Sequence, residues 1–129
     1  MVPNKPPVIT PEERALVKDA IVIPAMLEFL QNDIRTVSQM GLKLDLIIVK
    51  SLQAVEQQII SEHLDVRGEL RRRGIKLYAV ERSDAGLEGH YVCRGYRHRI
   101  SLLWSVVRTE VLRKASRYTG VTLTGGSPA

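Results

Sequence analysis

The chain has 129 residues, of which 44% are hydrophobic, and a formal net charge of +5. This length and apolar content are typical of one domain with one core. The longest uncharged apolar run, Ala20 to Leu27, is far shorter than the about 20 residues of a membrane-spanning helix. A single cysteine cannot form an intrachain disulfide, and the first residues lack the pattern of a secretory leader. We therefore expect a cytoplasmic protein with no membrane partner.

A first long helix is predicted to begin at Pro11. Thr10 and Glu13 have the spacing of a capping box, and proline is favoured at the first helical position. Apolar residues then recur at alternating spacings of 4 and 3: Leu16, Ala20, Ile23, Leu27, Leu30, Ile34 and Val37. This heptad seam indicates a helix that packs along one stripe. Pro24 removes one backbone amide beside the seam, which predicts a kink or a break there.

A second long helix is predicted after a turn at Gly41. Its apolar stripe also has helical spacing: Ile48, Leu52, Val55, Ile59, His63, Val66 and Leu70. The helix should end at the segment LRRRG, where Gly74 supplies the stop. Two helices with so short a connection should lie antiparallel, and about 30 residues would measure about 45 Å. We expect either a break near Ser61 or Gly68, or a projecting hairpin that finds a partner.

The remaining sequence predicts a β-hairpin and a last helix. Residues 75–81 (IKLYAVE) alternate like a strand, residues 82–89 (RSDAGLEG) resemble a turn-rich connector, and residues 90–100 (HYVCRGYRHRI) are predicted to return as the second strand. From Ile100 to Tyr118, apolar residues have helical spacing, and Gly120 follows as a stop.

The expected fold class is therefore α+β and predominantly helical: a long antiparallel helical hairpin, then a β-hairpin, then a C-terminal helix. Residues 1–10 are predicted to be a flexible arm, residues 11–120 a single domain and residues 121–129 a flexible tail.

Residues 90–104 gather side chains of the kinds that often form sites. His90, Cys93 and His98 are potential zinc ligands, but a regular strand points His90 and Cys93 to opposite faces. Such a strand also separates the two histidines by about 26 Å. We therefore expect no metal and no cofactor, and we expect Cys93 to be a buried hydrophobe rather than a nucleophile.

Strict alternation after Tyr91 and Cys93 would place arginines in the core. A one-residue bulge at Gly95 avoids this, because it shifts which residues face inward. The bulge would turn Tyr96, His98 and Ile100 inward, and it would leave Arg97 and Arg99 on the outer face. Trp104 should then be buried at this corner.

Positive charge is concentrated in the C-terminal half. Residues 1–66 hold six Lys/Arg against nine Asp/Glu, whereas residues 67–129 hold thirteen against five, a balance of +8. Eleven of those thirteen are arginine, whose planar fork suits bidentate contact with phosphate. The candidate nucleic-acid contacts are Arg71, Arg72, Arg73, Arg97, Arg99, Arg113 and Arg117.

Three classes of function remain open. Charge and arginine content favour a small, basic, regulatory nucleic-acid-binding protein without catalytic activity. The alternative is a homo-oligomeric structural or adaptor protein that acts through its helical hairpin, with Leu27, Leu30, Leu52 and Ile59 in the seam. An enzyme has least support, because no carboxylate pair, glycine-rich phosphate loop or metal spacing emerges. The expected partners are nucleic acid and further copies of the chain.

Overall fold

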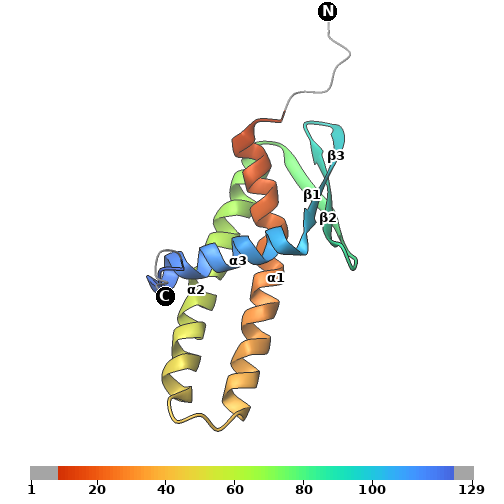
Figure 1. The fold of residues 1–129 in the computed structure, drawn as a ribbon. Coiled ribbons are helices and arrows are strands. Elements are labelled where there is room, and N and C mark those ends of the chain that lie inside the picture. Colours follow the sequence, from red (N-terminus) through yellow and green to blue (C-terminus); the bar gives the residue numbers. More distant parts are fainter. Residues whose placement is uncertain (1–8, 124–129) are drawn as a thin grey trace, which may run out of the picture.

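A computed structural model describes residues 9–123, so most of the predicted N-terminal arm (1–10) and C-terminal tail (121–129) lies outside the described residues. Figure 1 shows the elements in chain order: α1 (Pro11–Gln39), α2 (Asp45–Arg72), β1 (Ile75–Arg82), β2 (Gly86–Cys93), β3 (Tyr96–Leu103) and α3 (Trp104–Thr119). The predicted fold class, α+β and predominantly helical, is confirmed.

Helices α1 and α2 form the predicted antiparallel hairpin (Figure 1). α1 begins with the predicted capping box, in which Thr10 and Glu13 exchange two hydrogen bonds of 3.1 Å. α1 continues through Pro24, with buried residues on both sides of it, so the break, one of the two predicted alternatives, is wrong. α2 is likewise unbroken as far as Arg72, and Gly74 follows with a φ of 69°. None of the helices in residues 9–123 is both long and apolar enough to cross a membrane.

The sheet has three strands where two were predicted. β2 pairs antiparallel with both β1 and β3, in the order β1-β2-β3. Between β2 and β3 the chain turns at Arg94 and Gly95, whose φ values of 48° and 92° match the positive values of a type I′ hairpin turn. The predicted bulge at Gly95 is therefore wrong, since glycine there permits a reversal. β2 begins at Gly86, so half of it comes from the predicted connector.

The predicted pattern of faces survives this correction. A two-residue turn pairs Cys93 with Tyr96, so even-numbered residues of β3 share a face with odd-numbered residues of β2. That face is buried along most of β3, and Tyr96 is 41% exposed beside the turn. Arg97 and Arg99 lie exposed on the outer face, as predicted. The bulge of this sheet is in β1, where the register with β2 shifts between Leu77 and Ala79.

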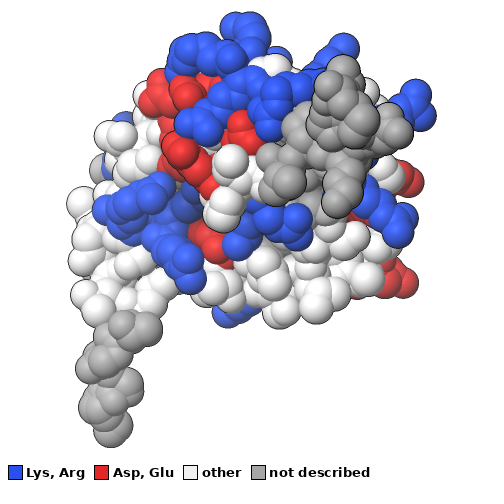
Figure 2. All heavy atoms as spheres, turned by 90° about the horizontal axis from the view of Figure 1, so that it is seen from above, with Lys and Arg blue, Asp and Glu red and all other residues white. Residues whose placement is uncertain are grey.

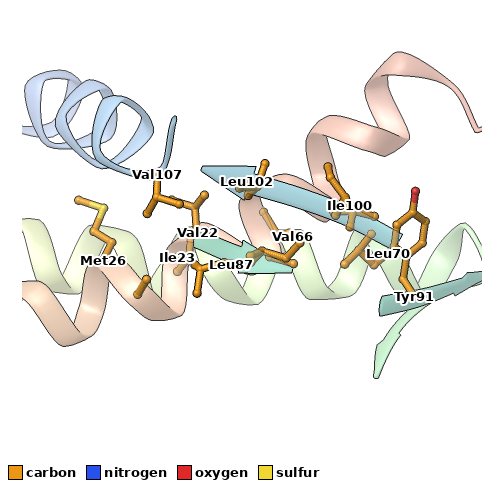
Figure 3. Close-up of a cluster of buried hydrophobic side chains, with 14 of the residues drawn as sticks. Val22, Ile23, Met26, Val66, Leu70, Leu87, Tyr91, Ile100, Leu102 and Val107 are labelled. Atoms are coloured by element: carbon orange, nitrogen blue, oxygen red, sulfur yellow. The ribbon is translucent and has the colours of Figure 1, made fainter. Parts of the chain in front are cut away.

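The core lies where α1 meets the sheet, α2 and α3. Ile21, Val22 and Ile23 are consecutive and each at most 2% exposed, so this part of α1 is covered on most sides. An apolar run with no polar face is typical of an enclosed helix. Figure 3 shows the side chains that meet it from the other elements: Val66, Leu70, Leu87, Tyr91, Ile100, Leu102 and Val107. Trp104 is half-buried at the edge of this core, less than predicted.

The predicted hairpin seam is only partly buried. Leu30 and Ile59 are buried, whereas Leu27 and Leu52 are half-buried. Between residues 31 and 54 no side chain is buried. Figure 1 shows why: the sheet and α3 lie against the upper part of the hairpin, and its lower end projects beyond them.

Gly89 determines how closely β2 approaches α1. A Cβ atom at this position would lie 2.4 Å from Cδ1 of Ile21, which is itself buried. We expect Gly89→Ala to lower the free energy of unfolding by about 1–3 kcal/mol through overpacking. The control is Gly68→Ala inside α2, where the nearest atom outside the backbone is 3.6 Å away. It should stabilise the protein by up to about 1 kcal/mol. Urea denaturation measures both changes. An unchanged free energy of unfolding in Gly89→Ala would contradict the close approach of β2 to α1.

Candidate functional site

The seven arginines predicted to contact phosphate lie on three elements or, for Arg73, directly after one. They form separate groups at the end of α2, on the outer face of β3 and on α3: Arg71, Arg72, Arg73, Arg97, Arg99, Arg113 and Arg117. Figure 2 looks onto the upper end of the molecule and shows groups of basic side chains with acidic side chains between them. The arginines therefore do not form one continuous run along a single element.

Five of the seven arginines form ion pairs with carboxylates. The pairs are Arg72 with Glu69 at 2.6 Å, Arg73 with Glu12 at 2.8 Å, Arg99 with Glu88 at 3.5 Å, Arg113 with Glu110 at 3.5 Å and Arg117 with Glu62 at 2.7 Å. Among residues 9–123, Arg71 and Arg97 have no such partner. A phosphate would have to share or displace a carboxylate at most of the predicted contacts.

Arg94, which the sequence pattern did not single out, ties the β2–β3 turn to the start of α1. Its guanidinium donates hydrogen bonds of 2.9 and 3.2 Å to the carboxylate of Glu13, whose side chain is 7% exposed. The hydrogen bond from Arg94, and then that from the backbone of Thr10, lower the pKa of Glu13 to about 2. Arg94 has a φ of 48° in this turn, a left-handed conformation that a non-glycine residue rarely adopts.

The depressed pKa of Glu13 predicts a loss of stability in acid. Because its ordinary value is 4.5 and its folded value about 2, the charged pair contributes fully above about pH 5 and is lost as the pH falls toward 2. Glu13→Gln keeps a side chain that suits the capping box but removes the charge. The difference in unfolding free energy between wild type and this variant should therefore shrink between about pH 6 and about pH 3. Urea denaturation at both values measures it, and a constant difference would contradict the assignment.

The basic residues of α3 help to hold the helix in place. Lys114 is buried, and its ammonium lies 2.6 Å from Glu62 and 3.0 Å from Asp19. Burial alone would lower the pKa of Lys114, but hydrogen bonds to these two carboxylates raise it above its ordinary value. Glu62 also accepts hydrogen bonds from Arg117 at 2.7 Å and Tyr118 at 2.6 Å. This network joins α3 to both helices of the hairpin.

The side chains that were considered as zinc ligands lie on both faces of the sheet. Cys93 is fully buried, as predicted, and burial raises the pKa of its thiol. His98 stacks on Tyr91 with ring centres 5.2 Å apart. His90 lies on the outer face, where it is opposite Arg99 in the register of β2 and β3. Within residues 9–123, no group of three His, Cys, Asp or Glu side chains is placed to hold a metal ion.

A groove of about 720 Å³ lies along β1 and is lined by that strand, by α1 and by α2. Arg67, Arg71 and Lys76 line it, together with His63. Burial, and then the nearby charge of Arg67, lower the pKa of His63. Of the three cations only Arg71 was predicted as a contact. The spacing of four residues between Arg67 and Arg71 places both on one helix face. This spacing was the sequence signal that could have identified Arg67.

The comparisons with known proteins give one match. The profile of the family described as YhjD protein matches residues 8–123 and thus includes every helix and strand of the structure. No curated protein and no solved structure matches the chain.

Proposed function

The chain belongs to the YhjD protein family, and we propose that it is a homo-oligomeric adaptor acting through protein–protein contacts of its helical hairpin. The observation that carries this proposal is the apolar surface at the hairpin tip, which we define as residues 31–54. Six large aliphatic side chains are exposed there: Met40, Leu42, Leu44, Leu46, Ile47 and Ile48. Apolar side chains gathered in this way usually mark a contact site.

A second copy of the hairpin is the partner that this surface suits. Among residues 9–123, each helix of the hairpin tip packs only against the other (Figure 1), and seam residues such as Ile34, Val37 and Leu52 remain half-buried. Two such hairpins can bury their seams together as a four-helix bundle. The tip has three Lys/Arg against two Asp/Glu, a net charge of +1, so two copies repel one another little.

Self-association can be tested with substitutions that do not disturb the core. Leu46 and Ile47 are 67% and 62% exposed in the single chain, so Leu46→Gln/Ile47→Gln should leave its fold, seen in the circular dichroism spectrum, unchanged. Sedimentation of the wild type at micromolar concentration should give a dimer or larger species, and the double variant should shift toward monomer. The control is Leu103→Gln, because Leu103 is 61% exposed but lies on β3. It should sediment like the wild type, and a strictly monomeric wild type would contradict the proposal.

Nucleic-acid binding is a second candidate, and the charge distribution favours it. Residues 67–129 carry thirteen Lys/Arg against five Asp/Glu. Lys76 and Arg97 are both in register with Val92, so β1 and β3 each add a basic residue to the same row of the sheet. On this view the protein is regulatory and not catalytic. It stands second because five of the seven predicted arginines already have carboxylate partners.

The salt dependence of binding tests this second candidate. Removing one side chain that binds a phosphate should lower the magnitude of the salt slope for duplex DNA by about 0.9. We expect Arg97→Glu/Arg99→Glu to weaken binding and flatten the slope in titrations of labelled duplex and single strand. Lys43→Glu/Lys50→Glu makes the same change in net charge on the hairpin tip, away from the sheet. Equal effects of the two variants, or no binding by the wild type, would count against a nucleic-acid surface on the sheet.

A further inference from the structure

The groove beside β1 exposes the free edge of the sheet. Six consecutive residues of β1, from Ile75 to Val80, line it. Successive side chains of a strand point to opposite faces, so consecutive residues border one space only where that space runs along the strand edge. β1 pairs with β2 on its other side and has no further strand beside it within residues 9–123. Backbone N–H and C=O groups of β1 therefore face the groove.

The groove is also basic along its length. Arg67 and Arg71 come from α2 and Lys76 from β1, and among the described residues no carboxylate lines the space. All three cations are exposed, and none forms an ion pair within residues 9–123. Their neighbours Arg72 and Arg73 both pair with Glu69. The cations at the groove thus remain available to an acidic ligand while those beside it are already neutralised.

Much of the rest of the lining is apolar, and two of its polar atoms lack a usual hydrogen-bond partner. Leu70 contributes from α2, and Ala20 and Pro24 from α1. Because Pro24 has no amide hydrogen, the carbonyl of Ala20 loses its usual helical donor. The buried Nδ1 of His63 has no hydrogen-bond partner among the residues that the structure describes. The groove therefore offers apolar contact, unpaired backbone groups and positive charge together.

We propose that this groove binds an extended acidic segment of a partner protein, which adds as a fourth strand beside β1. Strand addition uses backbone hydrogen bonds for affinity and alternate side chains for specificity. One set of side chains would pack on Leu70 and Pro24, and the carboxylates would meet Arg67, Arg71 and Lys76. This site goes beyond the proposed self-association, because it lies toward the opposite end of α2 from the hairpin tip.

Neither the chain's own termini nor a second copy of β1 suits the groove. Residues 1–8 and 124–129, which lie outside the described structure, contain no Asp or Glu. A second β1 would bring Lys76 toward the same three cations. An acidic strand from another protein carries the opposite charge and would be attracted to the groove.

The first test uses a labelled peptide of about eight residues, a common strand length, in which valine and glutamate alternate. Fluorescence anisotropy should show saturable binding at low salt. Replacing every glutamate by lysine should abolish binding. N-methylation of alternate backbone amides, on the edge that would pair with β1, keeps the charges but removes donors, and it should weaken binding about tenfold or more.

The protein side of the test compares two double variants. Arg67→Gln/Arg71→Gln removes two charges from the groove, and affinity for the peptide should fall about tenfold or more. Arg97→Gln/Arg108→Gln removes the same charge at exposed positions that form no ion pair within residues 9–123 and do not line the groove, and it should bind like the wild type. Leu46→Gln/Ile47→Gln should also bind the peptide like the wild type. Failure of the self-association proposal can therefore be distinguished from failure of the groove proposal.

Three results would overturn the proposal. One is the absence of saturable binding of the glutamate peptide to the wild type. Another is equal binding of the N-methylated peptide, because backbone pairing would then contribute nothing. The third is binding of a labelled single-stranded oligonucleotide, but not of the peptide, to the wild type. If Arg67→Gln/Arg71→Gln weakened this binding, the groove would be assigned to nucleic acid.

Discussion

The enclosure of residues 17–26 of α1 is the constraint on which the rest of the structure depends. This segment has almost no polar face, so α2, the sheet and α3 must each cover a side of it. Gly89 lets β2 come close to Ile21, and Val107 brings α3 over the same region. The apolar faces of the sheet and α3 are buried in this contact. No other element within residues 9–123 covers the hairpin tip. The hairpin tip lies beyond this enclosed segment, whereas the groove runs beside it at Ala20 and Pro24.

The basic side chains serve in part to hold the fold together. The C-terminal half of the sequence has a net charge of +8, but many of its cations form ion pairs within the structure. Lys114 and Arg117 fasten α3 to the hairpin through Glu62, and Arg94 fastens the β2–β3 turn through Glu13. Net charge alone therefore overstates the basic surface that a polyanion could contact. The cations at the groove are informative because they have no carboxylate partner among the described residues and no carboxylate there lines their space.

Local chemistry was readable from the sequence, and long-range pairing was not. The capping box at Thr10 and the stop at Gly74 follow from neighbouring residues, and both agree with the structure. The third strand was missed because its turn is Arg94-Gly95 rather than one of the usual asparagine- or aspartate-glycine pairs. The pairing of Arg94 with Glu13 joins residues 81 positions apart, which no local pattern records. For the same reason the sequence could indicate a basic half but could not separate structural arginines from available ones.

The positions of the two surfaces have a consequence for assembly. The hairpin tip comprises residues 31–54, whereas the groove involves residues 63–80 and the middle of α1. Contact between tips therefore leaves the groove of each copy open. A dimer would present two grooves, and a partner with two acidic segments would bind the second as an intramolecular step, at an effective concentration set by its linker. Modest affinity at each groove would then suffice for a stable complex, because the proposed self-association at one end of α2 would strengthen the proposed binding at the other.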